Sequence, residues 1–305
     1  MSPITEPSHL LNHPLVSSLQ LETSASQFDG VPKELEHAVR LETGRLIQAA
    51  GILLRLPQEI IAQAIVILQR FYIGPGSLLE SDSIVRLNAR PSAPQLTECD
   101  VAAASLYLTA KPSATPVSPR QVLTSFAFLS SLQPGSMLSH DTEDKLSSSW
   151  HLSEGEYEIS RAALYVCEAQ ILRALGFQTH VALPHTLCIN YLQTLDVFQS
   201  ESGPLLAKRT FAHLNSALLS PQMLYLTHQP SAITTAAIYL AARETGTKLP
   251  EVEWWEVFDV DREELGFLVV ALRSVQGFAS AEKQGRSERK VPMSVKELKE
   301  EIELR

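Results

Sequence analysis

Residues 46–57 decide the fold, and they read LIQAAGILLRLP. The run is apolar, tolerates one glycine in its middle and ends at a proline, which is typical of a short helix that stops at Pro57. A second apolar run, QAIVILQRFY, follows at 63–72. It predicts a helix that begins near Pro57 and ends before Gly74, because proline suits a first helical turn and the run Gly74-Pro75-Gly76 is a strong helix breaker.

The same signals predict ten helices, five in each half of the chain. In the first half, apolar helical patterns lie at 33–49, 57–72, 100–111, 119–132 and 156–176. In the second half they lie at 184–195, 203–219, 230–245, 251–258 and 261–277. We expect Asp261 to cap the last helix, with Glu264 in the reciprocal position. The predicted fold class is therefore all-α.

The third helix of each half carries the same sequence pattern. VAAASLYLTAK at 101–111 aligns with ITTAAIYLAAR at 233–243 at a constant offset of 132, and four of the eleven positions are identical. Small residues let other helices approach closely, as expected for a central helix wrapped by its neighbours. Ala-rich helices can also look alike by chance, but five predicted helices on both sides favour a duplication.

The chain is expected to consist of four parts and two inserted loops. The parts are a flexible N-terminal arm at 1–32, a first five-helix unit at 33–178, a second at 184–278, and an extension with a helix at 279–305. The first unit carries polar loop insertions near 78–97 and 133–153, where proline and serine interrupt the apolar pattern.

Composition and charge exclude several classes of protein. The chain has 305 residues and a formal net charge of −9, so sequence-independent binding to nucleic acid is not expected. It has no run of 18 apolar residues, and its N-terminus lacks the features of a secretory signal, so neither a membrane span nor secretion is predicted. Cys99, Cys167 and Cys188 lie far apart and are interpreted as reduced thiols.

No catalytic or cofactor motif is apparent. The nine histidines form no metal-ligand spacing, Gly74-Pro75-Gly76 is a turn rather than a phosphate-binding loop, and no nucleophile elbow occurs. No catalytic residue, metal or cofactor is therefore predicted. Trp254, Trp255 and Phe258 are expected to belong to the core. The dipeptides Thr115-Pro116, Ser118-Pro119 and Ser220-Pro221 fit proline-directed phosphorylation, but we prefer to interpret them as loop residues.

Two tandem five-helix units, each with an Ala-rich third helix, resemble the paired cyclin boxes. The runs at 46–57 and 63–72 are similar to the opening of the first box in the L-type transcriptional cyclins. The motif LRALGF at 172–177, the helix PHTLCINYLQTL at 184–195 and WWEVF at 254–258 look like L-type sequences as well. The segment at 289–291 and the helical pattern at 297–304 also resemble that family. The resemblance covers about residues 34–304, with the two loops as gaps.

The resemblance implies a kinase-binding site made of Lys111, Glu168 and Leu172. In cyclins, a lysine at the end of the third helix and a glutamate in the fifth helix bind the kinase, and Lys111 and Glu168 occupy those places. Leu172 lies one turn beyond Glu168 and could pack against the same partner. Alternatively, Lys111 is a solvated helix-end lysine and Glu168 a surface glutamate. The chain departs from the family at 112–116, where PSATP replaces the usual acidic residues.

A cyclin is not an enzyme, so the resemblance implies a regulatory subunit that binds and activates a cyclin-dependent serine/threonine kinase. For the L-type family it further implies a nuclear role in RNA polymerase II transcription and pre-mRNA processing. Other transcriptional cyclins of the T, K or C kind are an alternative within the family. From other classes, the alternatives are a two-box transcription scaffold of the general-transcription-factor kind, which would need a basic face, and a helical-bundle enzyme, for which no catalytic set is present.

Overall fold

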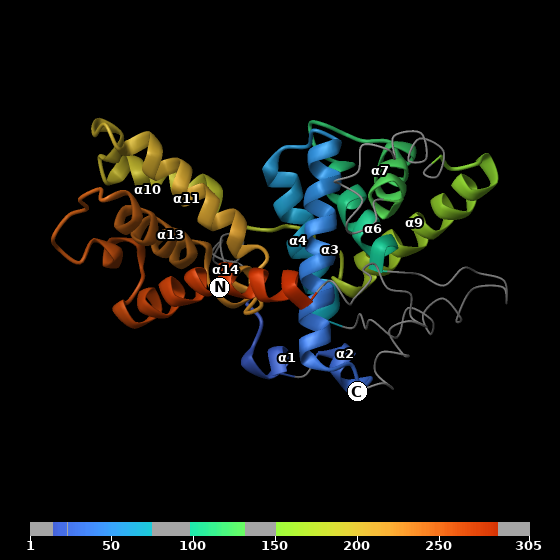
Figure 1. Ribbon diagram of the computed structural model, residues 1–305, viewed down its shortest axis with the longest axis horizontal. Coiled ribbons are helices and arrows are strands. Elements are labelled where there is room, and N and C mark those ends of the chain that lie inside the picture. Colours follow the sequence, from blue (N-terminus) through green and yellow to red (C-terminus); the bar gives the residue numbers. More distant parts are fainter. Residues whose placement is uncertain (1–14, 23, 75–97, 132–150, 286–305) are drawn as a thin grey trace, which may run out of the picture. The chain divides into compact units, whose positions relative to one another are not determined.

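The computed structural model describes residues 15–22, 24–74, 98–131 and 151–285, shown in Figure 1. Within these ranges the chain forms α-helices and short 3-10 helices and no β-strand, which confirms the all-α prediction. Contacts divide the described chain into two compact units. The first unit is 18–179 with 281–285, and the second unit is 180–280 with 15–17. The division at 179 and 180 falls between the two five-helix segments predicted from the sequence.

The first unit is built around one helix that is buried on every side. Its helices are α1 (Ser18–Glu22), α2 (Ala25–Phe28), α3 (Lys33–Leu53), α4 (Gln58–Ile73), α6 (Glu98–Ala110), α7 (Pro119–Ser131) and α9 (Glu154–Ala174). Helix α6 contacts α3, α4, α7 and α9 (Figure 1). Every residue from 101 to 110 is buried. An all-round apolar helix is stable only in such a position. The end of α6 is thereby fixed against α9.

The glycine in the run at 46–57 marks the closest approach of α3 and α4. A Cβ atom on Gly51 would lie 2.5 Å from Cγ1 of Ile61. Ile61 is buried on α4. Any larger side chain at position 51 would therefore push these two helices apart, because close-packed side chains leave no room for an added methyl group.

Residues 24–31 of the expected N-terminal arm pack against the first unit. Helix α2 contacts α3 and α4, and Ser24, Ser26 and Val31 are buried. Ser24 Oγ donates to Glu36 Oε2 at 3.0 Å, and Gln27 Nε2 donates to the same oxygen at 2.8 Å. Glu36 is fully buried on α3, so its carboxylate needs these donors. The polar side chains that suggested flexibility instead donate hydrogen bonds to the buried carboxyl group of Glu36.

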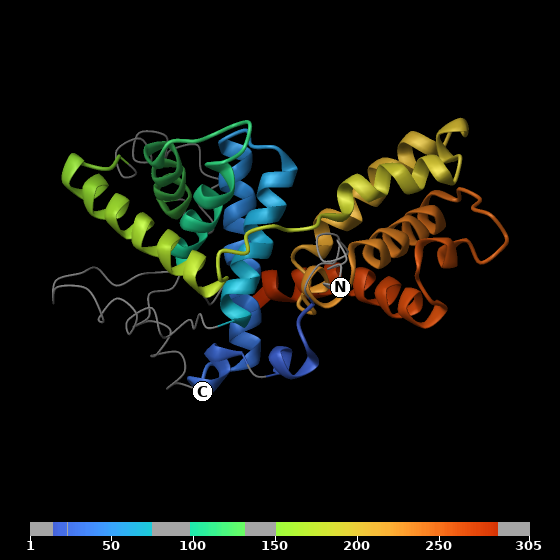
Figure 2. The same ribbon diagram turned by 180° about the vertical axis from the view of Figure 1, so that it is seen from behind.

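The second unit repeats the plan around α13. Its elements are α10 (Pro184–Thr194), η4 (Val197–Gln199), α11 (Gly203–Ala217), α12 (Leu224–Thr227), α13 (Pro230–Thr245), η5 (Trp254–Phe258) and the part of α14 (Arg262–Gly285) that ends at residue 280. Helix α13 contacts α10, α11, α12 and η5, and α11 runs beside it (Figure 2). Trp254 and Phe258 are buried and Trp255 half-buried, and the ring of Phe258 stacks on Tyr191 with centroids 3.8 Å apart. Their assignment to the core is confirmed for Trp254 and Phe258.

Two predicted elements of the second unit differ from the structure. The helix expected at 251–258 is the short 3-10 element η5, which ends at Asp259 in a left-handed conformation, φ 57°. The helix expected at 261–277 passes through Gly277 and continues to Gly285, because no positive φ occurs at Gly277 and good helix formers follow it. The predicted boundary at 278 therefore lies inside α14. Asp261 Oδ1 accepts the backbone N–H of Glu264 at 2.7 Å, as expected of a cap.

Some predictions concern residues that the structure does not describe. The proposed loop at 78–97, most of the loop at 133–153, the residues from 286 onward with the expected helix at 297–304, and the arm residues 1–14 lie outside the described ranges. Among the described helices, none is both long enough and apolar enough to cross a membrane.

Candidate functional site

The structure brings Lys111 and Glu168 together at the end of α6. Lys111 directly follows that helix, and its backbone N–H still donates to Tyr107 O at 2.9 Å. Glu168 lies on α9, 57 residues further along the chain, and its Oε1 is 3.0 Å from Lys111 Nζ. The contact between α6 and α9 thus creates an ion pair between residues that are remote in sequence.

The two members of this pair have different exposure. The Lys111 side chain is 54% exposed, whereas the Glu168 side chain is 11% exposed. Because the lysine is in water, the pair contributes little to folding stability. The carboxylate is largely desolvated, and its second oxygen makes no hydrogen bond to a residue that the structure describes. Lys111 therefore uses one oxygen of Glu168, and the other oxygen can accept a hydrogen bond from another group.

The ring of Tyr107 lies beside the cation, with Tyr165 next to that ring. Lys111 Nζ lies 5.5 Å from the ring centroid of Tyr107, and that ring is 6.2 Å from the ring of Tyr165. The hydrogen bond to Glu168 raises the pKa of Lys111, so the ammonium group stays charged at neutral pH. Burial raises the pKa of Tyr107, with the neighbouring Tyr165 acting in the same direction. The Tyr107 hydroxyl is therefore a neutral donor beside the charged pair.

Two apolar side chains lie on the same side of α9 as Glu168. Tyr165 is exposed and precedes Glu168 by three residues, and Leu172 is half-buried and follows it by four. The exposed Ile159 and Val166, seven residues apart, lie on the opposite side of the helix. A carboxylate with acceptor capacity left, a cation and these two side chains can bind a partner's backbone groups and apolar side chains.

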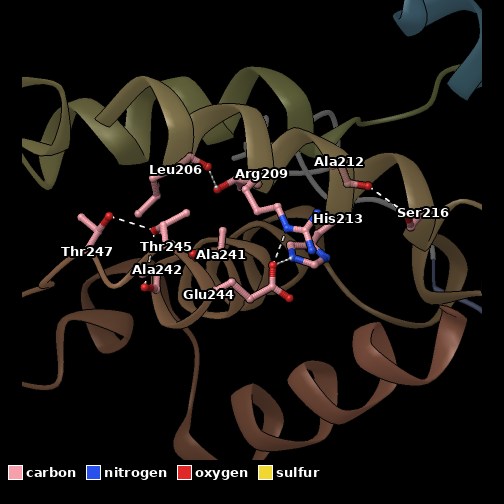
Figure 3. Close-up of polar contacts among 11 residues, drawn as sticks. Leu206, Arg209, Ala212, His213, Ser216, Ala241, Ala242, Glu244, Thr245 and Thr247 are labelled. Carbon is pink, nitrogen blue, oxygen red and sulfur yellow. Dashed lines mark hydrogen bonds and ion pairs between the residues drawn. The ribbon is translucent and has the colours of Figure 1, made fainter. Parts of the chain in front are cut away.

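The corresponding end of α13 in the second unit makes a different contact. Glu244 Oε2 pairs with Arg209 Nε, and it lies 3.0 Å from His213 Nε2, with both partners on α11 (Figure 3). Burial acts to raise the pKa of Glu244, but hydrogen bonds from Arg209 and His213 outweigh it and hold that pKa below its usual value. Arg243, which aligns with Lys111, is exposed. The end of α13 is therefore bound by residues of its own unit.

A chain of hydroxyl contacts follows Glu244 along the same helix end. Thr245 Oγ1 donates to Ala241 O at 2.9 Å and lies 2.9 Å from Thr247 Oγ1 (Figure 3). Thr247 Oγ1 donates to Ser202 Oγ at 3.0 Å. Gly246 between them has φ 69°, the left-handed conformation that glycine adopts at a helix end. The last turn of α13 is therefore joined to the start of α11 as well as to its middle.

Sequence reasoning missed the Arg209–Glu244–His213 cluster and the tyrosines beside Lys111. The spacing of Arg209 and His213, four residues apart on one helix, was the available signal for the cluster. Tyr107 was visible as a large ring among alanines in the third helix. Neither signal indicates a partner until the packing is known.

His185, Cys167 and Cys188 have the surroundings of residues that support the fold. His185 Nε2 lies 2.9 Å from Asn215 Oδ1, and its ring lies 5.8 Å from that of Phe211. Cys167 and Cys188 are buried, and burial raises the pKa of both thiols, that of Cys188 to about 12. Among the residues that the structure describes, no three His, Cys, Asp or Glu side chains gather as a metal site would require.

Curated sequences similar to this chain are cyclins. An uncharacterized cyclin-L1-like protein of Schizosaccharomyces pombe is 30% identical over 273 residues, which are 87% of this chain and 90% of that protein. Cyclin-L1-1 of Arabidopsis thaliana is 31% identical over 249 residues, 81% of this chain and 52% of that protein. Cyclin-L1 of Homo sapiens is 29% identical over 262 residues, 86% and 44% of the two chains. The chain thus spans about half the length of these plant and animal relatives. No family model matches it.

Two solved structures have a similar fold. The yeast RNA Pol II CTD kinase CTDK-1 complex contains a chain that matches with a TM-score of 0.64 and 13% identity, over 96% of this chain and 84% of the other. The CAK complex of Chaetomium thermophilum bound to ATP-gamma-S contains one with a TM-score of 0.54 and 15% identity, over 98% and 83%. At these identities the similarity concerns the fold alone.

Proposed function

This chain belongs to the L-type cyclins, and from that premise we propose that it binds and activates a cyclin-dependent serine/threonine kinase acting in RNA polymerase II transcription and pre-mRNA processing. A nuclear location is part of the same proposal. The chain is the regulatory subunit, and the phosphoryl transfer belongs to the kinase.

The observation that supports this proposal is the Lys111–Glu168 pair, with Tyr165 and Leu172 on the same side of α9. The pair contributes little to folding stability, yet it holds a mostly buried carboxylate at the surface. The hydrogen bonds of such a group strengthen when a second protein covers it and excludes water. Leu172 and Tyr165 would supply the apolar contact around it.

The proposed mechanism is a shift between two kinase conformations. Glu168 would accept backbone N–H groups, and Lys111 would donate to backbone carbonyls, near the mobile αC helix of the kinase. Holding that helix inward lets the kinase form its own catalytic Lys–Glu ion pair and open its activation loop. The chain acts by binding the active conformation more tightly than the inactive one.

A reconstitution experiment tests the function. The purified chain should show no phosphoryl transfer by itself, and it should raise the activity of its kinase on a polymerase tail peptide by orders of magnitude. Lys111→Ala should reduce this activation strongly. Arg243→Ala is the matched control, because Arg243 is the exposed cation at the aligned position of the second unit. Failure to co-purify with any cyclin-dependent kinase would contradict the proposal, and tight, salt-sensitive binding of a DNA duplex would favour the scaffold alternative.

A further inference from the structure

The structure distinguishes among the three Ser/Thr-Pro dipeptides of the described residues. Ser220 is 3% exposed, and its Oγ donates to Gln222 Oε1 at 2.6 Å. A kinase cannot reach this hydroxyl without unfolding its surroundings. Thr115 and Ser118, by contrast, are exposed, and both lie in the connection between α6 and α7. That connection begins at Lys111.

Ser118 is engaged as the cap of α7. Its Oγ donates to Gln121 Oε1 at 3.0 Å and accepts the backbone N–H of Gln121 at 3.3 Å. Its carbonyl accepts the backbone N–H of Val122 at 3.2 Å. Phosphorylation at this residue would require the first turn of α7 to open, with loss of its cap.

The backbone around Thr115 is free of such restraints. Among the described residues, the segment from Ala114 to Val117 makes no hydrogen bond between backbone groups, and only the N–H of Thr115 is held, by Ser113 Oγ at 3.1 Å. Pro116, the residue that a proline-directed kinase recognises, is exposed. A short segment with few backbone hydrogen bonds leaves the surface at low cost.

We propose that Thr115 is a phosphorylation site for a proline-directed serine/threonine kinase, and that phosphate at this position loosens the end of α6 that carries Lys111. The hydroxyl oxygen Oγ1 attacks the γ-phosphorus of ATP and forms the new O–P bond. The bond to the β–γ bridging oxygen breaks, ADP leaves, and the hydroxyl proton passes to the base of the kinase.

The expected effect follows from the surroundings of Thr115. Its Oγ1 lies 3.5 Å from Ser113 Oγ, which donates to the carbonyl of Ala110, the last residue of α6, at 2.7 Å. A dianionic phosphate here faces the negative end of the helix dipole and its carbonyl groups, which is unfavourable. The same phosphate attracts the ammonium group of Lys111. Both effects weaken the contact between Lys111 and Glu168.

Site mapping tests the first half of the proposal without reference to the proposed function. The full chain is incubated with a purified active cyclin-dependent kinase and Mg·ATP, and phosphate is located by mass spectrometry. We expect phosphate on Thr115, retained in Thr115→Ser and Ser118→Ala and lost in Pro116→Ala, which keeps the hydroxyl. The first half is overturned if Thr115 in the chain stays unmodified while the same enzyme modifies a synthetic peptide of residues 109–121.

Hydrogen exchange tests the second half. In the phosphorylated chain, the amides of Lys111 and Ser113, which donate to α6 carbonyls, should exchange faster than in Thr115→Ala treated identically. Equal exchange would overturn this half. A consequence rests on the proposed function: the phosphorylated chain should bind its kinase about fivefold more weakly, as expected for a charge at a helix end. If the unmodified chain bound no kinase, the proposed function would fail while the mapping and exchange results still stood.

Discussion

The two units share a central helix, but the ends of these helices make different contacts. In the first unit, Lys111 at the end of α6 reaches Glu168 on α9. In the second unit, Glu244 at the end of α13 is bound by Arg209 and His213 of α11. The cation at the aligned position, Arg243, is exposed.

The difference shows where duplicated helices can diverge. The buried faces of α6 and α13 both carry several alanines, because small residues let neighbouring helices pack closely. The helix ends are at the surface, where polar contacts can be exchanged at a cost of a few tenths to about 1 kcal/mol each. The second unit uses Glu244 for internal contacts, whereas the first unit holds the Glu168 carboxylate beside Tyr165 and Leu172. Under the proposed function, the difference between the units therefore lies in the helix ends rather than in the shared fold.

The largest expected effect is on the core of the second unit. Trp254→Ala should lower the free energy of unfolding of that unit by about 3–5 kcal/mol, because it removes a buried ring that contacts Phe258. The affinity for the kinase should stay unchanged in the folded protein. Urea unfolding with fluorescence and circular dichroism measures the change, and the half-buried neighbour in Trp255→Ala is the control with a smaller loss. A large loss of kinase affinity would mean that the second unit also contributes to binding.

The next largest effect is a difference in kinase affinity between variants of Glu168 and of Glu244. Glu168→Ala should weaken kinase binding by about 2–5 kcal/mol, or about 30- to 4000-fold, because a cation is left unpaired in a dry interface. Glu244→Ala should leave binding within about twofold, since its partners lie in its own unit. Calorimetric titration of both variants against the kinase checks this. Lys111→Ala combined with Glu168→Ala should cost less than the sum of the two. Equal losses for both glutamates would remove the distinction between the units.

A smaller effect compares two helical glycines. Gly51→Ala should destabilise the first unit by about 1–3 kcal/mol, because the added methyl group would meet the side chain of Ile61. Gly277→Ala in α14 should stabilise the second unit by up to about 1 kcal/mol, since nothing lies within 4 Å of its added Cβ. Melting curves of the two variants measure the difference. Equal destabilisation by both would contradict the close approach of α3 and α4.

The smallest effect is a pH dependence confined to the first unit. Burial, with Arg40 next in effect, lowers the pKa of His37 to about 4, while Glu36 opposes the shift and Lys33 adds to it. The unfolded chain binds a proton near the ordinary pKa of 6.5, so between these values it holds more protons than the folded chain. Stability is therefore lost as pH falls from about 6.5 to about 4, by about 1 kcal/mol for a partly exposed ring.

Urea unfolding at pH 7 and pH 5 measures the contribution of His37. His37→Gln should remove most of the difference between the two pH values, because glutamine does not titrate. A variant that keeps the full pH dependence would show that another group is responsible.

Much of the fold was predictable because its signals are local. Pro184, Gly203 and Pro230 begin helices at the predicted positions, and Gly176 adopts a positive φ of 55° after α9. The errors arose where local signals were weak or misleading. The segment at 24–31 is polar, yet Ser24 and Gln27 are needed by the buried Glu36. Gly277 resembled a stop signal, but no left-handed turn follows it.

The sequence by itself determined the helices, the repeat and the two central helices, because periodicity and proline or glycine act over a few residues. Only the tertiary structure decided which charged side chains form pairs, which hydroxyl groups are exposed and which residues bind Glu244. Lys111 and Glu168 are 57 residues apart, and Ser220 and Thr115 have the same dipeptide signal with opposite burial. These outcomes depend on which helix faces pack together, and that is settled by the whole core rather than by any short segment.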